Sequence, residues 1–212
     1  LVGPLPQYCK VHAYVSAKML PLVLIFSFSL YWGITDSTIV TPSPRSNCVL
    51  AKKPLPNYYW RKFEGDIPPD AVIGGHTSSG AVTYIGQVLI THSDKNALVP
   101  GTIYVGKDEV EAPFYGAFKS KAYTHILCSD TPKKLQWRKV NEHELRMINE
   151  YVVVGGYEQT QTLFIGRASY SNNLIVGKVF LGNSPSMYIL KPDDNELLLT
   201  TFEVLVYEDE IF

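Results

Sequence analysis

The sequence predicts an all-β fold in which two tandem repeats form a pseudo-twofold sandwich or barrel. Three observations support this prediction. The 14 Tyr and 9 Phe beside 15 Gly and 14 Pro favour many short strands joined by turns. Residues 82–90 alternate larger side chains with smaller or polar ones, which is the pattern of a half-buried strand. Four short motifs recur later in the chain in the same order, which indicates an internal duplication.

The N-terminal region is dominated by an apolar segment. The chain begins with Leu1, its first Met is Met19, and residues 20–34 contain no charged side chain. This run is shorter than the roughly 18 residues of a membrane-spanning helix and has the length of the apolar region of a secretory signal. We therefore expect residues 19–35 to be a signal peptide and residues 1–18 to lie upstream of the mature protein. A signal anchor that is not removed and a buried strand are the alternatives.

A proline-rich tether is expected between this segment and the folded part. Residues 36–57 contain four prolines, Pro42, Pro44, Pro54 and Pro56. Each proline also biases the residue before it away from the helical region, so an extended segment is expected. Folded structure should start near Tyr58, with the first repeat at residues 58–136 and the second at 137–212.

The duplication is read from four pairs of motifs that are separated by 76 to 81 residues. The matching segments are 60–62 with 137–139, 71–76 with 152–157, 83–87 with 163–167, and 99–103 with 175–179. Further strands are expected at 162–170, 174–181, 186–190 and 201–207. A helix of one or two turns is expected only at 141–149. The paired glycines that end an apolar strand in each copy indicate either tight turns or a close approach of another backbone.

Charge and motif content exclude several classes of function. The formal net charge is −1. The first 59 residues hold five basic groups and one acidic group, so 14 basic and 19 acidic groups remain in the rest of the chain, a net charge of −5. An acidic folded region argues against nucleic acid as a partner. The sequence contains no phosphate-binding loop and no nucleophile elbow. It also lacks a metal-ligand spacing, because Met147 stands where a zinc motif starting at His143-Glu144 needs its second His. We expect no enzyme activity, no metal and no cofactor.

Two cysteines would remain after removal of the signal, Cys48 in the tether and Cys128 near the end of the first repeat. In an oxidising compartment they could form a disulfide. Two unpaired thiols, with Cys128 buried in a strand, are the alternative.

The repeated motifs resemble the DM-nine repeat family, an invertebrate family whose members usually carry two tandem repeats. The resemblance extends from about Trp60 to Tyr207. The segments that carry it best are 153–157, 165–167, 176–178 and 202–205. It implies an all-β fold of two intertwined repeats and, in members with a known biochemical role, lectin activity toward mannose-type sugars in innate recognition of microbes.

The resemblance also implies a sugar site in the second repeat. An acidic residue after the Gly-Gly-aromatic triplet and the Lys of a Gly-Lys pair map to Glu158 and Lys178, with Arg167 between them. A carboxylate accepts hydrogen bonds from vicinal hydroxyls and an ammonium donates to them, while Tyr157 offers an apolar face for a pyranose ring. An ordinary exposed ion pair is the alternative interpretation.

The first repeat departs from this pattern. Thr77 stands at the position of the acid, Gln87 replaces the arginine, and Thr102 replaces the lysine. We therefore expect the first-repeat site to be lost or altered, so that at most one family-type site remains.

The leading hypothesis is a secreted carbohydrate-binding protein that recognises a mannose-type glycan or a microbial surface. The alternative is a non-catalytic protein-interaction or structural module whose sugar site has decayed. A homodimer is compatible with either. No nucleic acid and, after signal removal, no membrane is expected as a partner. If the apolar segment is not a signal, the chain is signal-anchored or cytoplasmic instead.

Overall fold

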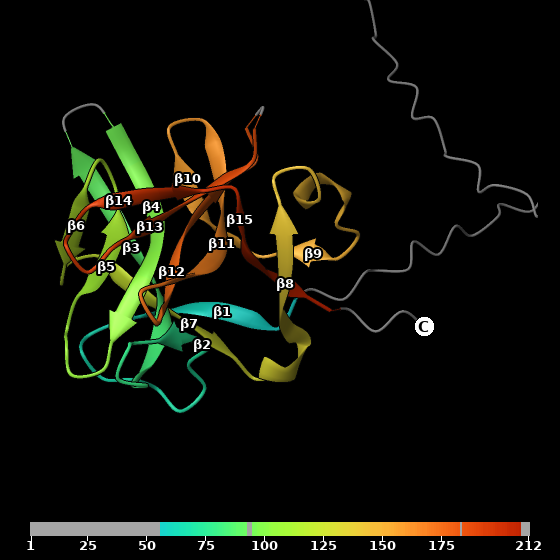
Figure 1. Ribbon diagram of the computed structural model, residues 1–212. Coiled ribbons are helices and arrows are strands. Elements are labelled where there is room, and N and C mark those ends of the chain that lie inside the picture. Colours follow the sequence, from blue (N-terminus) through green and yellow to red (C-terminus); the bar gives the residue numbers. More distant parts are fainter. Residues whose placement is uncertain (1–55, 93–94, 183, 209–212) are drawn as a thin grey trace, which may run out of the picture. The chain divides into compact units, whose positions relative to one another are not determined.

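The computed structural model describes residues 56–92, 95–182 and 184–208. The predicted upstream segment, signal peptide and Cys48 lie outside these residues, as does the tether except for Pro56 and Asn57. The regular secondary structure of the described residues is almost entirely strand, which confirms the all-β prediction (Figure 1).

Strands of the first copy are β1 (Tyr58–Lys62), β2 (Ile73–His76), β3 (Val82–His92), β4 (Lys95–Tyr104), β5 (Val110–Pro113), β6 (Ala117–Ser120) and β7 (Thr124–Ser129). Strands of the second copy are β8 (Leu135–Asn141), β9 (Tyr151–Val152), β10 (Val154–Glu158), β11 (Gln161–Tyr170), β12 (Asn173–Phe180), β13 (Ser186–Leu190), β14 (Glu196–Leu199) and β15 (Thr201–Tyr207). Between Tyr170 of β11 and Asn173 of β12 stands a two-residue turn in which Ser171 and Asn172 both have positive φ, as a tight hairpin requires.

The strand pairings repeat from one copy to the other. In the first copy β3 pairs with β2, β4 and β7, and in the second β11 pairs with β10, β12 and β15. Outer strands repeat as well, because β1 pairs with β7 as β8 pairs with β15, and β5–β6 follows β4 as β13–β14 follows β12. Gly86 faces Gly101 in one copy and Gly166 faces Gly177 in the other.

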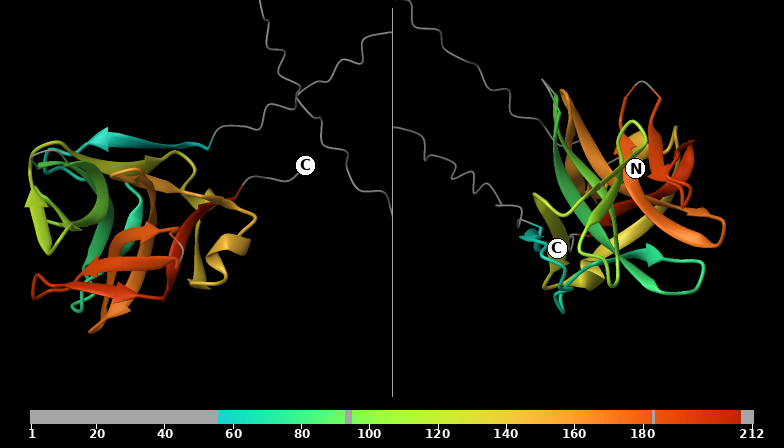
Figure 2. Two further views of the ribbon diagram at one scale, coloured as in Figure 1. Left: turned by 90° about the horizontal axis from the view of Figure 1, so that it is seen from above. Right: turned by 90° about the vertical axis from the view of Figure 1, so that its left-hand side faces the viewer.

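The two copies are joined by strand pairs that cross between them. β2 pairs with β12 through His76 and Leu174, and β10 pairs with β4 through Tyr157 and Leu98. With the pairs inside each copy, these contacts form a closed cycle of ladders, β3–β2–β12–β11–β10–β4 and back to β3. Figure 2 shows the strands of the two copies interleaved rather than stacked as separate halves.

Paired glycines make these crossings possible. A Cβ added at Gly75 would lie 2.0 Å from the carbonyl oxygen of Leu174, and one added at Gly156 would lie 2.0 Å from that of Leu98. No side chain fits at such a distance, so a second backbone can approach only where glycine stands. Of the two interpretations from the sequence, close approach therefore applies to both pairs.

The apolar residues form three clusters. One is made mostly of first-copy residues around Val88, and a second is made of second-copy residues around Val179. The third joins the copies and contains equivalent residues of each, such as Ile85 and Ile165 or Leu127 and Leu205. Each copy thus contributes one face to a shared core.

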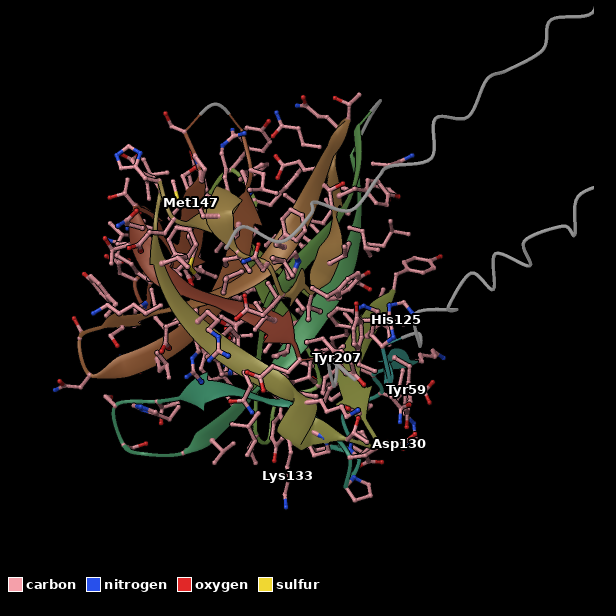
Figure 3. All side chains as sticks on the ribbon, turned by 90° about the vertical axis from the view of Figure 1, so that its right-hand side faces the viewer. Tyr59, His125, Asp130, Lys133, Met147 and Tyr207 are labelled. Carbon is pink, nitrogen blue, oxygen red and sulfur yellow. The ribbon has the colours of Figure 1, made fainter. Side chains whose placement is uncertain are left out.

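The helix of one or two turns predicted at 141–149 is present as a single short turn. The segment contains a 3-10 turn, Leu145–Met147, and a second 3-10 turn, Pro132–Lys134, precedes β8. The Asn141 side chain accepts hydrogen bonds from the backbone N–H groups of His143 and Glu144, which ends the strand and starts a tight turn. In Figure 3, Met147 of this turn projects outward, and its side chain is exposed.

Candidate functional site

The structure brings together the two principal predicted site residues. Glu158 is the last residue of β10 and Lys178 lies in β12, and the Lys178 Nζ atom lies 2.7 Å from a Glu158 carboxylate oxygen. The side chains are only 5% and 11% exposed, for lysine and glutamate respectively. The pair is therefore a buried ion pair, unlike the exposed pair that was the alternative interpretation. Burial makes the pair costly to desolvate and strengthens the attraction between its charges.

Aromatic rings surround the lysine. Its Nζ atom lies 5.3 Å from the ring centre of Phe180 and 5.5 Å from those of Tyr188 and Phe114. All three distances are within the range of cation–π attraction. Phe180 and Tyr188 also meet edge to face, with their centroids 5.9 Å apart. The ammonium group is thus held in an apolar pocket with one carboxylate as its charged partner.

Sequence reasoning missed these three rings. Phe180 follows Lys178 by two residues in a strand, so the period of two already places it on the same face. Tyr188 lies opposite Lys178 in the neighbouring strand β13. Phe114 follows β5 in the first copy, and no local pattern indicates that it crosses to the second-copy site.

The structure places Tyr157 and Arg167 away from this pair. Tyr157 precedes Glu158 in β10, so its side chain points to the opposite face, and it is 42% exposed. The Arg167 Nε atom donates a hydrogen bond of 2.7 Å to Glu203, and its guanidinium carbon lies 4.3 Å from the Trp137 ring centre. Arg167 also donates to the backbone carbonyl of Gly74 at 3.3 Å, which links it to the first copy.

The first-copy residues at the positions of the predicted sugar site serve mainly to connect the two copies. The buried Gln87 amide donates a 2.7 Å hydrogen bond to the carbonyl of Gly155, as Arg167 does to Gly74. The buried Thr102 hydroxyl donates to the carbonyl of Val176 at 3.1 Å and accepts from its N–H group at 3.2 Å. Thr77 accepts a hydrogen bond from the N–H group of Ala81 within the β2–β3 turn.

A different polar cluster occupies the first-copy face that corresponds to the lysine pocket. Tyr104 follows Thr102 by two residues, as Phe180 follows Lys178, and Glu111 lies opposite Thr102 as Tyr188 lies opposite Lys178. The buried Glu111 carboxylate accepts a hydrogen bond from Lys107. Burial, followed by the nearby carboxylates of Glu111 and Asp194, raises the pKa of Tyr104 to about 12.

Cys128 is buried and forms no disulfide within the described residues. Burial and the charge of Asp70 raise its pKa to about 11, so the thiol stays protonated at neutral pH. Because Cys48 lies outside the described residues, the disulfide stays a prediction.

Within residues 56–92, 95–182 and 184–208, no cluster of three or more His, Cys, Asp or Glu side chains has an arrangement suited to a metal ion.

Among the same described residues, no helix is long and apolar enough to cross a membrane.

Comparison with known protein families gives one match. The sequence model of the DM9 repeat matches residues 90–199, which run from the end of β3 through β14 and include both Glu158 and Lys178. A search of curated proteins found no significant match. The matched segment covers more than half of the 212 residues and contains the second-copy site and its aromatic pocket. The chain therefore belongs to the DM9 repeat family.

Proposed function

We propose that the chain is a carbohydrate-binding protein that recognises mannose-type sugars through Glu158 and Lys178. The observation that carries this proposal is the buried ion pair, with its 2.7 Å contact inside a pocket of aromatic rings. DM9 repeat proteins are known in general terms for sugar binding, which supports the same conclusion.

The chemistry of the pair fits a sugar. Vicinal hydroxyls both donate and accept hydrogen bonds, so they can donate to the carboxylate and accept from the ammonium at the same time. The rings beside Lys178 offer C–H-rich pyranose faces an apolar surface. Since both side chains are almost closed to solvent, a sugar must displace part of the aromatic cover to reach them.

The proposal also covers where the protein acts and on what target. We expect the mature protein to be secreted and to act on glycans of a microbial surface, in innate recognition, as a monomer or homodimer. No catalytic role is proposed.

Direct binding tests the proposal. Isothermal titration of the full chain with methyl α-mannoside should show binding, and a glycan array should rank mannose-type structures first. The double variant Glu158→Gln/Lys178→Gln should lose this binding, because it removes both charges without leaving one of them buried alone. Lys191→Gln is the matched control, since Lys191 also pairs with a carboxylate, that of Asp193 at 2.8 Å, and lies over the ring of Tyr170. A folded wild-type chain without glycan affinity, or a double variant that binds normally, would contradict the proposal.

One observation favours a second candidate, a protein-interaction or structural module without sugar affinity. Glu158 and Lys178 satisfy each other in the structure, and the first-copy residues Gln87 and Thr102 serve to connect the copies. A purely structural pair predicts that the double variant changes stability while the wild-type chain shows no glycan binding in the same titration.

A further inference from the structure

A row of three charged residues crosses the second copy at a distance from the buried pair. Arg167 in β11 lies opposite Glu203 in β15, and Glu203 in turn lies opposite Lys139 in β8. Directly opposite residues of antiparallel strands project on the same face, about 5 Å apart. The row therefore presents positive, negative and positive side chains side by side.

This row lies in a cleft of about 500 Å³. The hydroxyl-bearing residues Ser169 and Thr201 line it together with the three charged residues, and Leu174 and Phe202 supply apolar surface. Its size is within the range of pockets that hold small ligands. Leu174 precedes Lys178 by four residues in β12, which corresponds to about 13 Å along the strand. The cleft is thus distinct from the Glu158–Lys178 site.

The charges of the cleft do not balance. Glu203 neutralises Arg167 through the 2.7 Å hydrogen bond, and the stacking of Arg167 on Trp137 holds the guanidinium group in place. Lys139 is exposed, and among the residues that the structure describes its side chain forms no hydrogen bond or ion pair. One positive charge therefore remains available at the mouth of the cleft.

The equivalent cleft of the first copy lacks this feature. The corresponding row is Gln87, His125 and Lys62, aligned by the same register. Of these, His125 and Lys62 line a cavity of about 660 Å³, whereas Gln87 is buried and does not line it. His125 of this row, labelled in Figure 3, lies opposite Lys62 of β1. The two lysines that line this cleft are both paired, Lys62 with Glu64 and Lys121 with Asp108 at 2.8 Å.

We propose that the second-copy cleft binds the acidic group of a carboxylated or sulfated sugar residue, with Lys139 as its anion contact. The ammonium group is a compact point charge and does not select between planar carboxylate and tetrahedral sulfate. Ser169 and Thr201 can exchange hydrogen bonds with sugar hydroxyls, and Leu174 and Phe202 face the apolar part of the ring. A single free cation is too few for nucleic acid, which needs many phosphate contacts. This inference goes beyond mannose recognition and does not depend on it.

Titration of the full chain with sodium glucuronate and with glucosamine 6-sulfate tests the proposal, and glucose serves as the neutral ligand. Wild type should bind at least one acidic sugar, more weakly at high salt, and should bind glucose at least tenfold more weakly. Lys139→Gln should reduce acidic-sugar binding about tenfold or more, the loss expected for one charge-assisted hydrogen bond. Lys62→Gln, the matched change in the first-copy row, should bind normally. The relative response to the two acidic sugars identifies the anion that the cleft prefers.

Two further measurements, of the unfolding temperature and of amide chemical shifts, distinguish a loss of binding from a loss of structure and locate the bound sugar. Because Lys139 is exposed, Lys139→Gln should unfold at the same temperature as wild type. Amide chemical shifts on adding glucuronate should change at Ser169, Thr201 and Glu203 and stay constant at Glu158. Absence of acidic-sugar binding by wild type, equal binding by Lys139→Gln, or shift changes confined to the Glu158 region would each overturn the proposal, whether or not mannose binds.

Discussion

The two copies of the repeat share their strand pairings but use equivalent positions for different chemistry. Gln87 and Arg167 both donate to a glycine carbonyl of the other copy, yet only Arg167 also carries an ion pair and a stacked ring. Thr102 connects the copies where Lys178 holds a buried carboxylate. The shared framework depends on glycines, apolar residues and a few hydrogen bonds. Charged positions on that framework are free to change in one copy while the other keeps them.

The largest expected loss of stability is at the glycines where strands of the two copies cross, and there the copies should respond alike. Gly75→Ala and Gly156→Ala should each lower the free energy of unfolding by about 3 kcal/mol or more, because a carbonyl oxygen stands 2.0 Å from the new Cβ. Gly182→Ala is the control, since no described residue beyond its chain neighbours lies within 4 Å of its Cβ position. Urea unfolding measures all three. A small loss of stability at one of these two glycines and a large loss at the other would show that the two crossings are not equivalent.

The next largest loss of stability is expected at a pair that only the second copy has. Glu158→Gln should cost about 3 kcal/mol, because it leaves the Lys178 ammonium buried among three rings without its counter-charge. The double variant Glu158→Gln/Lys178→Gln should recover part of this loss. Thermal and urea unfolding of the set check the expectation. If the single and double variants are equally stable, the pair is not coupled as its 2.7 Å contact implies.

In the first copy, the corresponding change should be smaller. Thr102→Val removes both hydrogen bonds to Val176 and should cost about 1–3 kcal/mol, whereas Thr102→Ser keeps the hydroxyl and should cost less. Urea unfolding of the two variants provides the measurement. Equal losses in the two variants would mean that the hydrogen bonds contribute no more to stability than the γ-methyl group of Thr102, which would contradict the expectation.

The smallest effect appears at alkaline pH. Tyr104 has a pKa of about 12, raised from 10.0 by burial and nearby carboxylates, while Phe180 at the equivalent position cannot titrate. A raised pKa means that the folded state binds the proton more tightly, so this contribution to stability is complete below pH 10 and declines as the pH rises toward 12. Tyr104→Phe should therefore flatten the fall in unfolding temperature between pH 10 and pH 12. An unchanged slope would contradict the assignment.

The sequence predicted much of this framework. Alternation in residues 82–90 and 162–170 indicated strands, and the repeated motifs indicated the duplication. The family resemblance assigns Glu158 and Lys178 to one site, and an ion pair between them was the alternative interpretation. Burial of that pair was not predicted, because it depends on Phe114 from the other copy. The sequence also did not predict the Arg167–Glu203–Lys139 row, because only the register of three separate strands places those side chains together.

The crossing of strands between the copies has a consequence for how the chain acquires its structure. The ladder cycle closes only when His76 meets Leu174 and Leu98 meets Tyr157, contacts that join distant parts of the sequence. Such non-local pairing slows folding, because long loops must close before the contacts form. During synthesis the first copy cannot complete its sheet until β10 and β12 have emerged. Until then its strand edges stay open, so we expect the newly made first half to depend on rapid completion of the chain to avoid aggregation.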